Sequence, residues 1–245
     1  MMSSKQIGLS QVSKWNVIKQ STIYKLKVYN HIFYSLFIYQ LIGFLFVFNS
    51  TSGTGMSMGS LSINIEHKTA HALFYLTVIW LIISSAQLGL KQGRSLMSGV
   101  VTDNKIHHFS NGLLILLMSV IGAVTILLFS LTAELFFYIF NTPYFTNISI
   151  NYFLELLSAF LYLLLAGSLA YFVTNLVMRM KLIAYLLLFI LFISSLIPEI
   201  SPLIYFYYFL FEEMNVFLFI IKISLLIILL FIGSLVITRQ MEVER

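Results

Sequence analysis

Long uncharged apolar runs constrain this chain more than any other feature. Ile106–Ala133 forms 28 consecutive positions without Asp, Glu, Lys or Arg, and Thr69–Leu90 forms 22. A helix needs about 20 mostly apolar residues to cross the hydrocarbon core of a bilayer, which is about 30 Å thick. Of all 245 residues, 60% are hydrophobic and 9% are charged, against about 25% charged in a soluble globular domain. The chain is therefore predicted to be an integral membrane protein, which excludes soluble-enzyme and disordered classes.

Six segments reach or approach the length of a membrane-spanning helix. They cover residues 31–48, 69–90, 109–133, 152–178, 182–198 and 215–238. The third helix is expected to begin near Phe109 and to overrun the outer interface, which Glu134 would mark. The Ser- and Gly-rich tract Asn49–Asn64 is expected to leave the membrane. The predicted fold is an all-α integral membrane protein, with residues 29–245 forming one six-helix transmembrane domain after a separate segment, 1–28.

The basic residues predict the orientation of these spans. If six spans are assumed, 12 of the 14 Lys and Arg residues fall on one side, which carries a net charge of +9 against −4 on the other. Loops rich in Lys and Arg face the cytoplasm. The chain is thus expected to be a multi-pass protein of a bacterial cell membrane with both termini cytoplasmic. The pI of 9.3 then reflects orientation rather than binding to nucleic acid.

The first 28 residues predict an amphipathic helix that lies on the inner leaflet. This segment holds five lysines and lacks the apolar core of a signal peptide. At about 100° per residue, its apolar side chains fall within an arc of roughly 140°. Lys19 lies inside that arc and would have to extend toward the headgroups. An unstructured basic tail is the alternative. The predicted lipid-facing residues are Val12, Trp15, Ile18, Ile23 and Leu26.

The segment Lys91–His108, between the second and third spans, predicts a short cytoplasmic helix. Leu96, Met97, Val100 and Val101 are spaced to give this helix one apolar face. Such a helix is suited to docking into a groove of a soluble partner. A plain connector is the alternative.

These features together resemble the permease subunits of ABC-2 type transporters of Gram-positive bacteria. The matching tract is Gly89–Gly99, with the sequence GLKQGRSLMSG. The six predicted spans and the predicted N-terminal interfacial helix are the other points of resemblance. The resemblance implies a second permease copy or homologue, and a cytoplasmic ATPase subunit that docks on a coupling helix. The coupling residues are Gln92, Gly93, Arg94, Ser95, Leu96, Met97, Val100 and Val101.

The energy source is expected to lie on another chain. Gly53–Gly59 is Gly-rich but lacks the lysine of a phosphate-binding loop. The chain is therefore predicted not to be an enzyme and to hold no cofactor or metal, while ATP and Mg would be bound by the partner ATPase. The apolar spans favour export of a hydrophobic or amphipathic substrate, such as a peptide, by alternating access. Exporters of phenol-soluble-modulin toxin peptides and lantibiotic immunity permeases are similar in length and composition.

Two features predict an outer gate. Residues 194–213 are too apolar for an exposed loop, yet Pro198, Glu199 and Pro202 interrupt any single helix. A re-entrant pair of short helices fits this pattern, and an interfacial aromatic belt is the alternative. Lys222 lies about 10 Å into the sixth span and is a gate candidate, unless its side chain extends to the headgroups. Its candidate partners are Glu155, Glu212 and Glu213.

A non-transporting membrane protein, either an assembly partner or a protease, is the rival hypothesis. Intramembrane proteases of the CAAX-processing type carry Glu-Glu-x-x-x-Arg, but Phe217 stands where the Arg is required after Glu212 and Glu213. His107 and Asn111 have the His-x-x-x-Asn spacing but precede the Glu pair. His107 and His108 are instead expected at the membrane interface. The absence of Cys excludes disulfides, a thiol nucleophile and thiolate zinc sites.

Overall fold

The structure, a computed structural model, describes residues 14–49, 52–58, 61–67, 71–90, 104–140, 152–179, 181 and 215–243. Five of the helices in these ranges are long and apolar enough to cross a membrane, so the chain is a multi-pass membrane protein with a helical body. The helices are α1 (Lys14–Val28), α2 (Asn30–Asn49), α3 (His71–Gly89), α5 (Asn104–Ile139), α6 (Tyr152–Arg179) and α9 (Val216–Val243). The strands are β1 (Ser52–Met58) and β2 (Leu61–His67).

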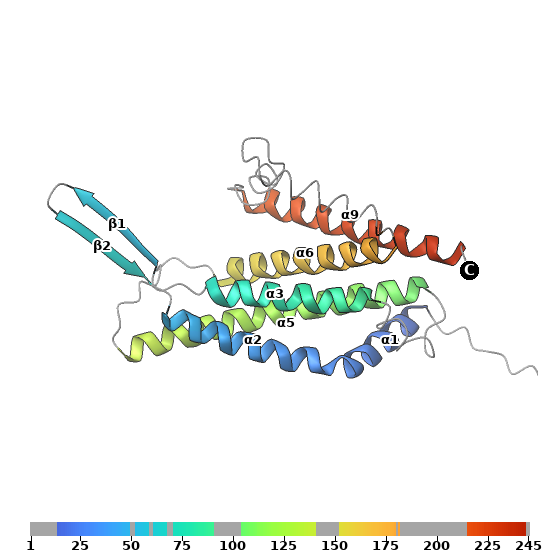
Figure 1. The fold of residues 1–245 in the computed structure, drawn as a ribbon, viewed down its shortest axis with the longest axis horizontal. Helices are drawn as coiled ribbons and strands as arrows, with labels where there is room; N and C mark the ends of the chain where they lie inside the picture. Colours follow the sequence, from blue (N-terminus) through green and yellow to red (C-terminus); the bar gives the residue numbers. More distant parts are fainter. Residues whose placement is uncertain are drawn as a thin grey trace, which may run out of the picture.

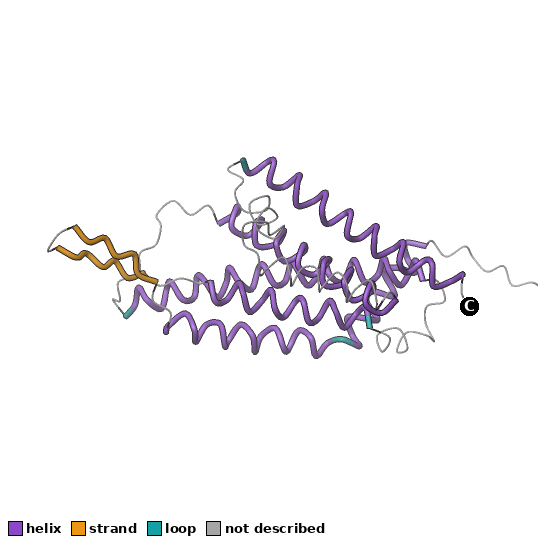
Figure 2. Tube along the Cα trace, turned by 45° about the horizontal axis from the view of Figure 1, so that its top comes forward, coloured by secondary structure: helices purple, strands orange, loops and turns teal. Residues whose placement is uncertain are grey.

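The helices lie alongside one another in an elongated bundle (Figure 1). One end of the bundle, here called the basic end, contains the beginnings of α1 and α5 and the ends of α3, α6 and α9. The strands project beyond the other, here called the hairpin end (Figure 2). The spans α2, α3, α6 and α9 begin within two residues of the predicted boundaries.

The last two helices run in the same direction. Tyr162 of α6 contacts Phe219 near the start of α9, and Asn175 of α6 contacts Ser234 further along it. The chain therefore returns from the basic end to the hairpin end between α6 and α9. The predicted fifth span, 182–198, and the predicted re-entrant segment, 194–213, lie outside the described residues.

Helix α5 begins earlier than predicted. It starts at Asn104 rather than near Phe109 and has 36 residues, about 54 Å at 1.5 Å per residue, so it is longer than the hydrocarbon core. Asn is a favoured helix N-cap. The polar residues that follow remain helical because buried partners satisfy their hydrogen bonds. At the other end α5 continues past the predicted boundary at residue 133 to Ile139.

The tract between α2 and α3 forms a β-hairpin, which the all-α prediction did not include. Its strands pair antiparallel, with Ser52 opposite His67 and Met58 opposite Leu61. The sequence from Leu61 to Glu66 alternates apolar and polar residues with period two, a pattern that favours a strand.

The bundle core is built on close contacts between small and large residues. Trp80 of α3 is buried, and its Nε1 donates to the carbonyl of Ile32 at 2.9 Å and to Ser35 Oγ at 3.1 Å on α2. Gly167 of α6 lies against α3 and α5, where an added Cβ would be 2.9 Å from Ile115 Cγ2 and 3.1 Å from Ser85 Oγ. Small residues at such crossings let the backbones of membrane helices approach closely.

The outside of the bundle is apolar. Large side chains on α2 and α9, such as Phe37, Leu45 and Leu229, are more than half exposed. A soluble protein rarely exposes a continuous apolar surface of this kind. These faces are suited to contact with lipid or with another membrane helix.

Gly167→Leu is predicted to destabilise the helical bundle. The larger side chain would collide with Ile115 and Ser85, and overpacking of this kind costs about 1–3 kcal/mol. Leu169→Ala, two residues away at a position that is 40% exposed, is the matched control. The melting temperature of the detergent-purified protein should fall clearly for Gly167→Leu and little for the control. Equal melting temperatures would contradict the close packing around Gly167.

Candidate functional site

The candidate site is a group of polar side chains at the basic end, centred on Lys25 of α1. Lys25 is only 1% exposed. Its Nζ donates to the carbonyl oxygen of His107 at 3.0 Å and to the side-chain oxygens of Ser110 and Asn111, all on α5. An ammonium group has three N–H donors, and here three oxygens accept from it. Together with neighbours described below, these residues form the Lys25 cluster: Ser21, Lys25, His107, His108, Ser110, Asn111 and Tyr171.

Asn111 connects Lys25 to two further helices. While its Oδ1 accepts from Lys25, its Nδ2 donates to the carbonyl oxygen of Leu88 on α3 at 3.3 Å and to the hydroxyl of Tyr171 on α6 at 3.1 Å. The same nitrogen lies 3.4 Å from His107 Nε2. One amide side chain therefore links α1, α3, α5 and α6 at a single level of the bundle.

His108 extends the cluster toward α9. Its ring is 1% exposed, its Nδ1 lies 3.2 Å from the Tyr171 hydroxyl, and its centroid is 4.3 Å from that of Phe231 on α9. His108 is expected at the membrane interface, and at this end of α5 Tyr171 and Phe231 enclose its ring within the bundle. His107 is half-buried and takes part in the cluster through its carbonyl oxygen.

Polar contacts also hold α6 against α9 at the basic end. Asn175 Nδ2 donates to Ser234 Oγ at 2.9 Å, and Arg179 Nη1 donates to the carbonyl oxygen of Ile237 at 2.9 Å. Asn175 and Ser234 are fully buried. Hydrogen bonds therefore connect α1, α3, α5, α6 and α9 near this end of the bundle.

Burial has a strong effect on the protonation of Lys25. Transfer of an ammonium group out of water disfavours its charged form, and burial lowers the pKa of Lys25 from 10.5 to about 7. The three oxygens around Nζ belong to neutral groups, a peptide carbonyl, a hydroxyl and an amide. Lys25 can therefore gain or lose its proton near neutral pH while it holds α1 to α5.

No protein-family model, curated protein or solved structure matches this chain. The resemblance to ABC-2 permeases therefore stays a prediction.

The predicted coupling helix lies outside the described residues. This applies to each of its predicted residues: Gln92, Gly93, Arg94, Ser95, Leu96, Met97, Val100 and Val101. The helices on either side are described, and both belong to the site. Leu88, near the end of α3, accepts from Asn111, and His107, in the first turn of α5, accepts from Lys25.

Helix α1 forms as predicted, and the face that it packs against α5 is polar. Ser21, Thr22 and Lys25 are its most buried residues, whereas Trp15 is 60% exposed and Ile23 is 44% exposed. Lys25 lies beyond one edge of the apolar arc predicted to face the lipid, and in the structure it packs against α5. Leu26 packs against the core, Ile18 lines a pocket, Lys19 is exposed and Val12 lies outside the described residues.

The predicted outer gate is only partly covered by the structure. Glu155 is exposed in the first turn of α6, and Lys222 is half-buried on α9. Glu212 and Glu213 lie outside the described residues, so the gate stays a prediction. Within the described part of the chain, no group of three or more His, Asp or Glu residues is placed to hold a metal ion.

Sequence reasoning missed the site because it treated polar residues as the ends of spans. One signal was present. Ser21 and Lys25 are four residues apart, and so are His107 and Asn111, which places each pair on one face of a helix. Two polar stripes on neighbouring helices indicate that the helices pack on each other through those stripes.

The pKa of Lys25 predicts a specific dependence of stability on pH. Between pH 7 and 10.5 the unfolded state binds more protons at Lys25 than the folded state does, so the free energy of unfolding should rise with pH in this window. Lys25→Met should flatten that rise, because it removes the group that titrates; the His107 carbonyl and the Ser110 hydroxyl keep other donors, while Asn111 Oδ1 loses the hydrogen bond from Lys25. The measurement is the melting temperature in detergent from pH 7 to 9.5.

Lys27→Met, at an exposed position two residues away, is the control. It should keep the pH dependence of the unchanged protein. Identical pH profiles for Lys25→Met and Lys27→Met would contradict the assignment of a lowered pKa to Lys25.

Proposed function

We propose that this chain is the permease subunit of an ATP-driven exporter that moves a hydrophobic or amphipathic substrate, such as a peptide, out of the cell. The observation that carries the proposal is the position of the Lys25 cluster. It joins the two helices that flank residues 91–103, the segment predicted to contact the ATPase.

The hydrogen bonds of the Lys25 cluster are suited to transmitting movement from the ATPase to the helices of the bundle. Asn111 contacts α3 near its end and α6 near its middle, while Lys25 contacts the first two turns of α5. Buried polar contacts are costly to break when the partners have no water to replace them. A force applied between α3 and α5 would therefore move α1, α3, α5 and α6 together at the basic end.

The rest of the bundle is compatible with this role. Motion of helices against one another is the usual basis of alternating access. The exposed apolar faces of α2 and α9 offer surfaces for the second permease copy that would be needed to enclose a path. Within the proposal, the ATPase binds ATP and Mg on the cytoplasmic side, and both termini of this chain lie on that side.

Substitution in the coupling segment tests the proposal. Arg94→Glu combined with Met97→Glu should reduce co-purification of a Walker-motif ATPase by at least about tenfold, as expected when a central interface residue is lost. Export of an amphipathic peptide should fall in parallel. Recovery of the ATPase is measured by quantitative mass spectrometry after solubilisation of the native membrane.

A matched control places the same charges on the opposite side of the membrane. Lys68→Glu combined with Met58→Glu should leave recovery of the ATPase unchanged. If no Walker-motif ATPase accompanies the unchanged protein, the rival hypothesis of a non-transporting membrane protein is favoured. If Arg94→Glu with Met97→Glu leaves export intact, the assignment of the coupling segment is wrong.

A further inference from the structure

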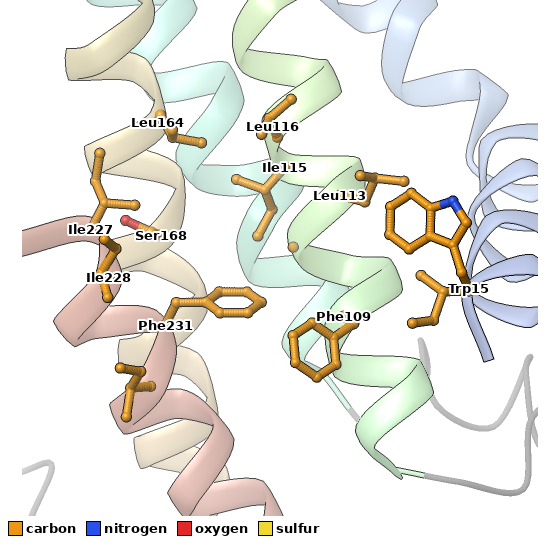
Figure 3. A pocket seen from close by; sticks show the side chains of 13 residues that line it. Trp15, Phe109, Leu113, Ile115, Leu116, Leu164, Ser168, Ile227, Ile228 and Phe231 are labelled. Atoms are coloured by element: carbon orange, nitrogen blue, oxygen red, sulfur yellow. The ribbon is translucent and has the colours of Figure 1, made fainter. Parts of the chain in front are cut away.

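An apolar pocket lies between α1 and α9 near the basic end of the bundle. It has a volume of about 350 Å³ and is lined by residues of α1, α5, α6 and α9. In Figure 3, Trp15 stands on the α1 side and Phe231 on the α9 side, with Phe109 and Leu116 of α5 between them. The volume falls at the lower end of the range of about 300–1,000 Å³ that is typical of ligand pockets.

The lining of the pocket offers almost no polar group. Among the lining residues, only Ser168 and Trp15 carry a polar side-chain atom, and the Ser168 hydroxyl donates to the carbonyl oxygen of Leu165 on its own helix at 2.9 Å. Gly112 allows the ring of Phe231 to form the wall, since an added Cβ would be only 2.4 Å from that ring. A cavity of this kind is suited to an apolar ligand and not to water.

The pocket opens on the outer surface of the bundle, where lipid would lie. Four of its lining residues are at least 45% exposed, Trp15 at 60%, Ile228 at 57%, Ile232 at 53% and Phe109 at 45%. The apolar span of α5 begins at Lys105, so Phe109 and Leu116 lie about 6 and 17 Å along it. This depth corresponds to one leaflet of a hydrocarbon core about 30 Å thick. Acyl chains are the apolar molecules present at that level.

Two exposed lysines neighbour lining residues of the pocket along the chain. Lys19 directly follows the lining residue Ile18, and Lys105 precedes Phe109 by one helical turn. Trp side chains favour the headgroup region of a membrane, and Trp15 lines the pocket. Basic residues near the membrane surface attract anionic headgroups.

We propose that the pocket holds an acyl chain of an anionic phospholipid from the leaflet at the basic end, with the phosphate between Lys19 and Lys105. The lipid fills the space between α1 and α9 that the described part of the chain leaves open. It is therefore a bound structural lipid, separate from any transported substrate, and the inference does not depend on the proposed function.

Lipid binding to the full chain tests this proposal. In native mass spectrometry of the detergent-purified protein, phosphatidylglycerol should bind at least about tenfold more tightly than phosphatidylcholine with the same acyl chains. Leu116→Trp, which fills the mouth, should weaken binding of both lipids. Leu128→Trp, at an exposed position of α5 outside the pocket, should bind both lipids like the unchanged protein.

The headgroup part of the proposal has its own variants. Lys19→Gln combined with Lys105→Gln should remove the preference for phosphatidylglycerol while phosphatidylcholine still binds. Lys27→Gln, about 12 Å further along α1 from Lys19, should keep the preference. Equal binding of the two lipids to the unchanged protein would overturn the assignment of an anionic lipid.

Crosslinking identifies other occupants of the pocket. Because the chain has no cysteine, Ile228→Cys can carry a single photo-crosslinker at the mouth of the pocket. Capture of phosphatidylglycerol from vesicles that contain equal parts phosphatidylglycerol and phosphatidylcholine would support the proposal. Capture of a second copy of the chain, or of residues 182–214 of the same chain, would overturn it, as would binding unchanged by Leu116→Trp.

Discussion

The fold at the basic end depends on the burial of one amino group. An ionised amine transferred from water into a protein interior is costly unless hydrogen bonds compensate for the lost hydration. Lys25 obtains its compensation from three oxygens in the first two turns of α5. Asn111 in turn directs its remaining hydrogen bonds to α3 and α6. The requirement to satisfy Lys25 thus fixes the relative positions of four helices, which apolar contacts alone would leave free to slide.

Hydropathy predicted the spans well because the length of a membrane helix is set by the bilayer. Helices α2 and α3 begin within two residues of the expected positions, and α6 begins at Tyr152 as predicted. The start of α5 was missed because the 28 uncharged residues 106–133 exceed what a straight crossing requires, so Lys105, His107 and His108 were placed before the helix. Polar residues mark the end of a span only if water must solvate them, and here their partners are other buried side chains.

The Lys25 cluster was not predicted for a related reason. A hydrophobic arc identifies the packed face of a helix only when its neighbour is apolar. The part of α5 that α1 contacts is polar, so Ser21 and Lys25 face the protein while Trp15 and Ile23 face outward. For a helix at a membrane surface, the apolar face can contact lipid and the polar face can contact protein. Sequence alone does not show which neighbour each face has.

The two halves of the bundle differ in how their helices are held. Toward the hairpin end, Val47, Leu73 and Ala133 form a small apolar cluster, and one buried polar link joins three helices, since Gln40 of α2 donates to the hydroxyls of Thr77 on α3 and Thr125 on α5. Near the basic end, hydrogen bonds between buried groups join five helices, and each bond requires a particular geometry. A two-state movement of this bundle would therefore be concentrated toward the hairpin end, with the basic end moving as a unit. If the chain works as a permease, force applied beside α3 and α5 would be converted into separation of helices on the opposite side of the membrane.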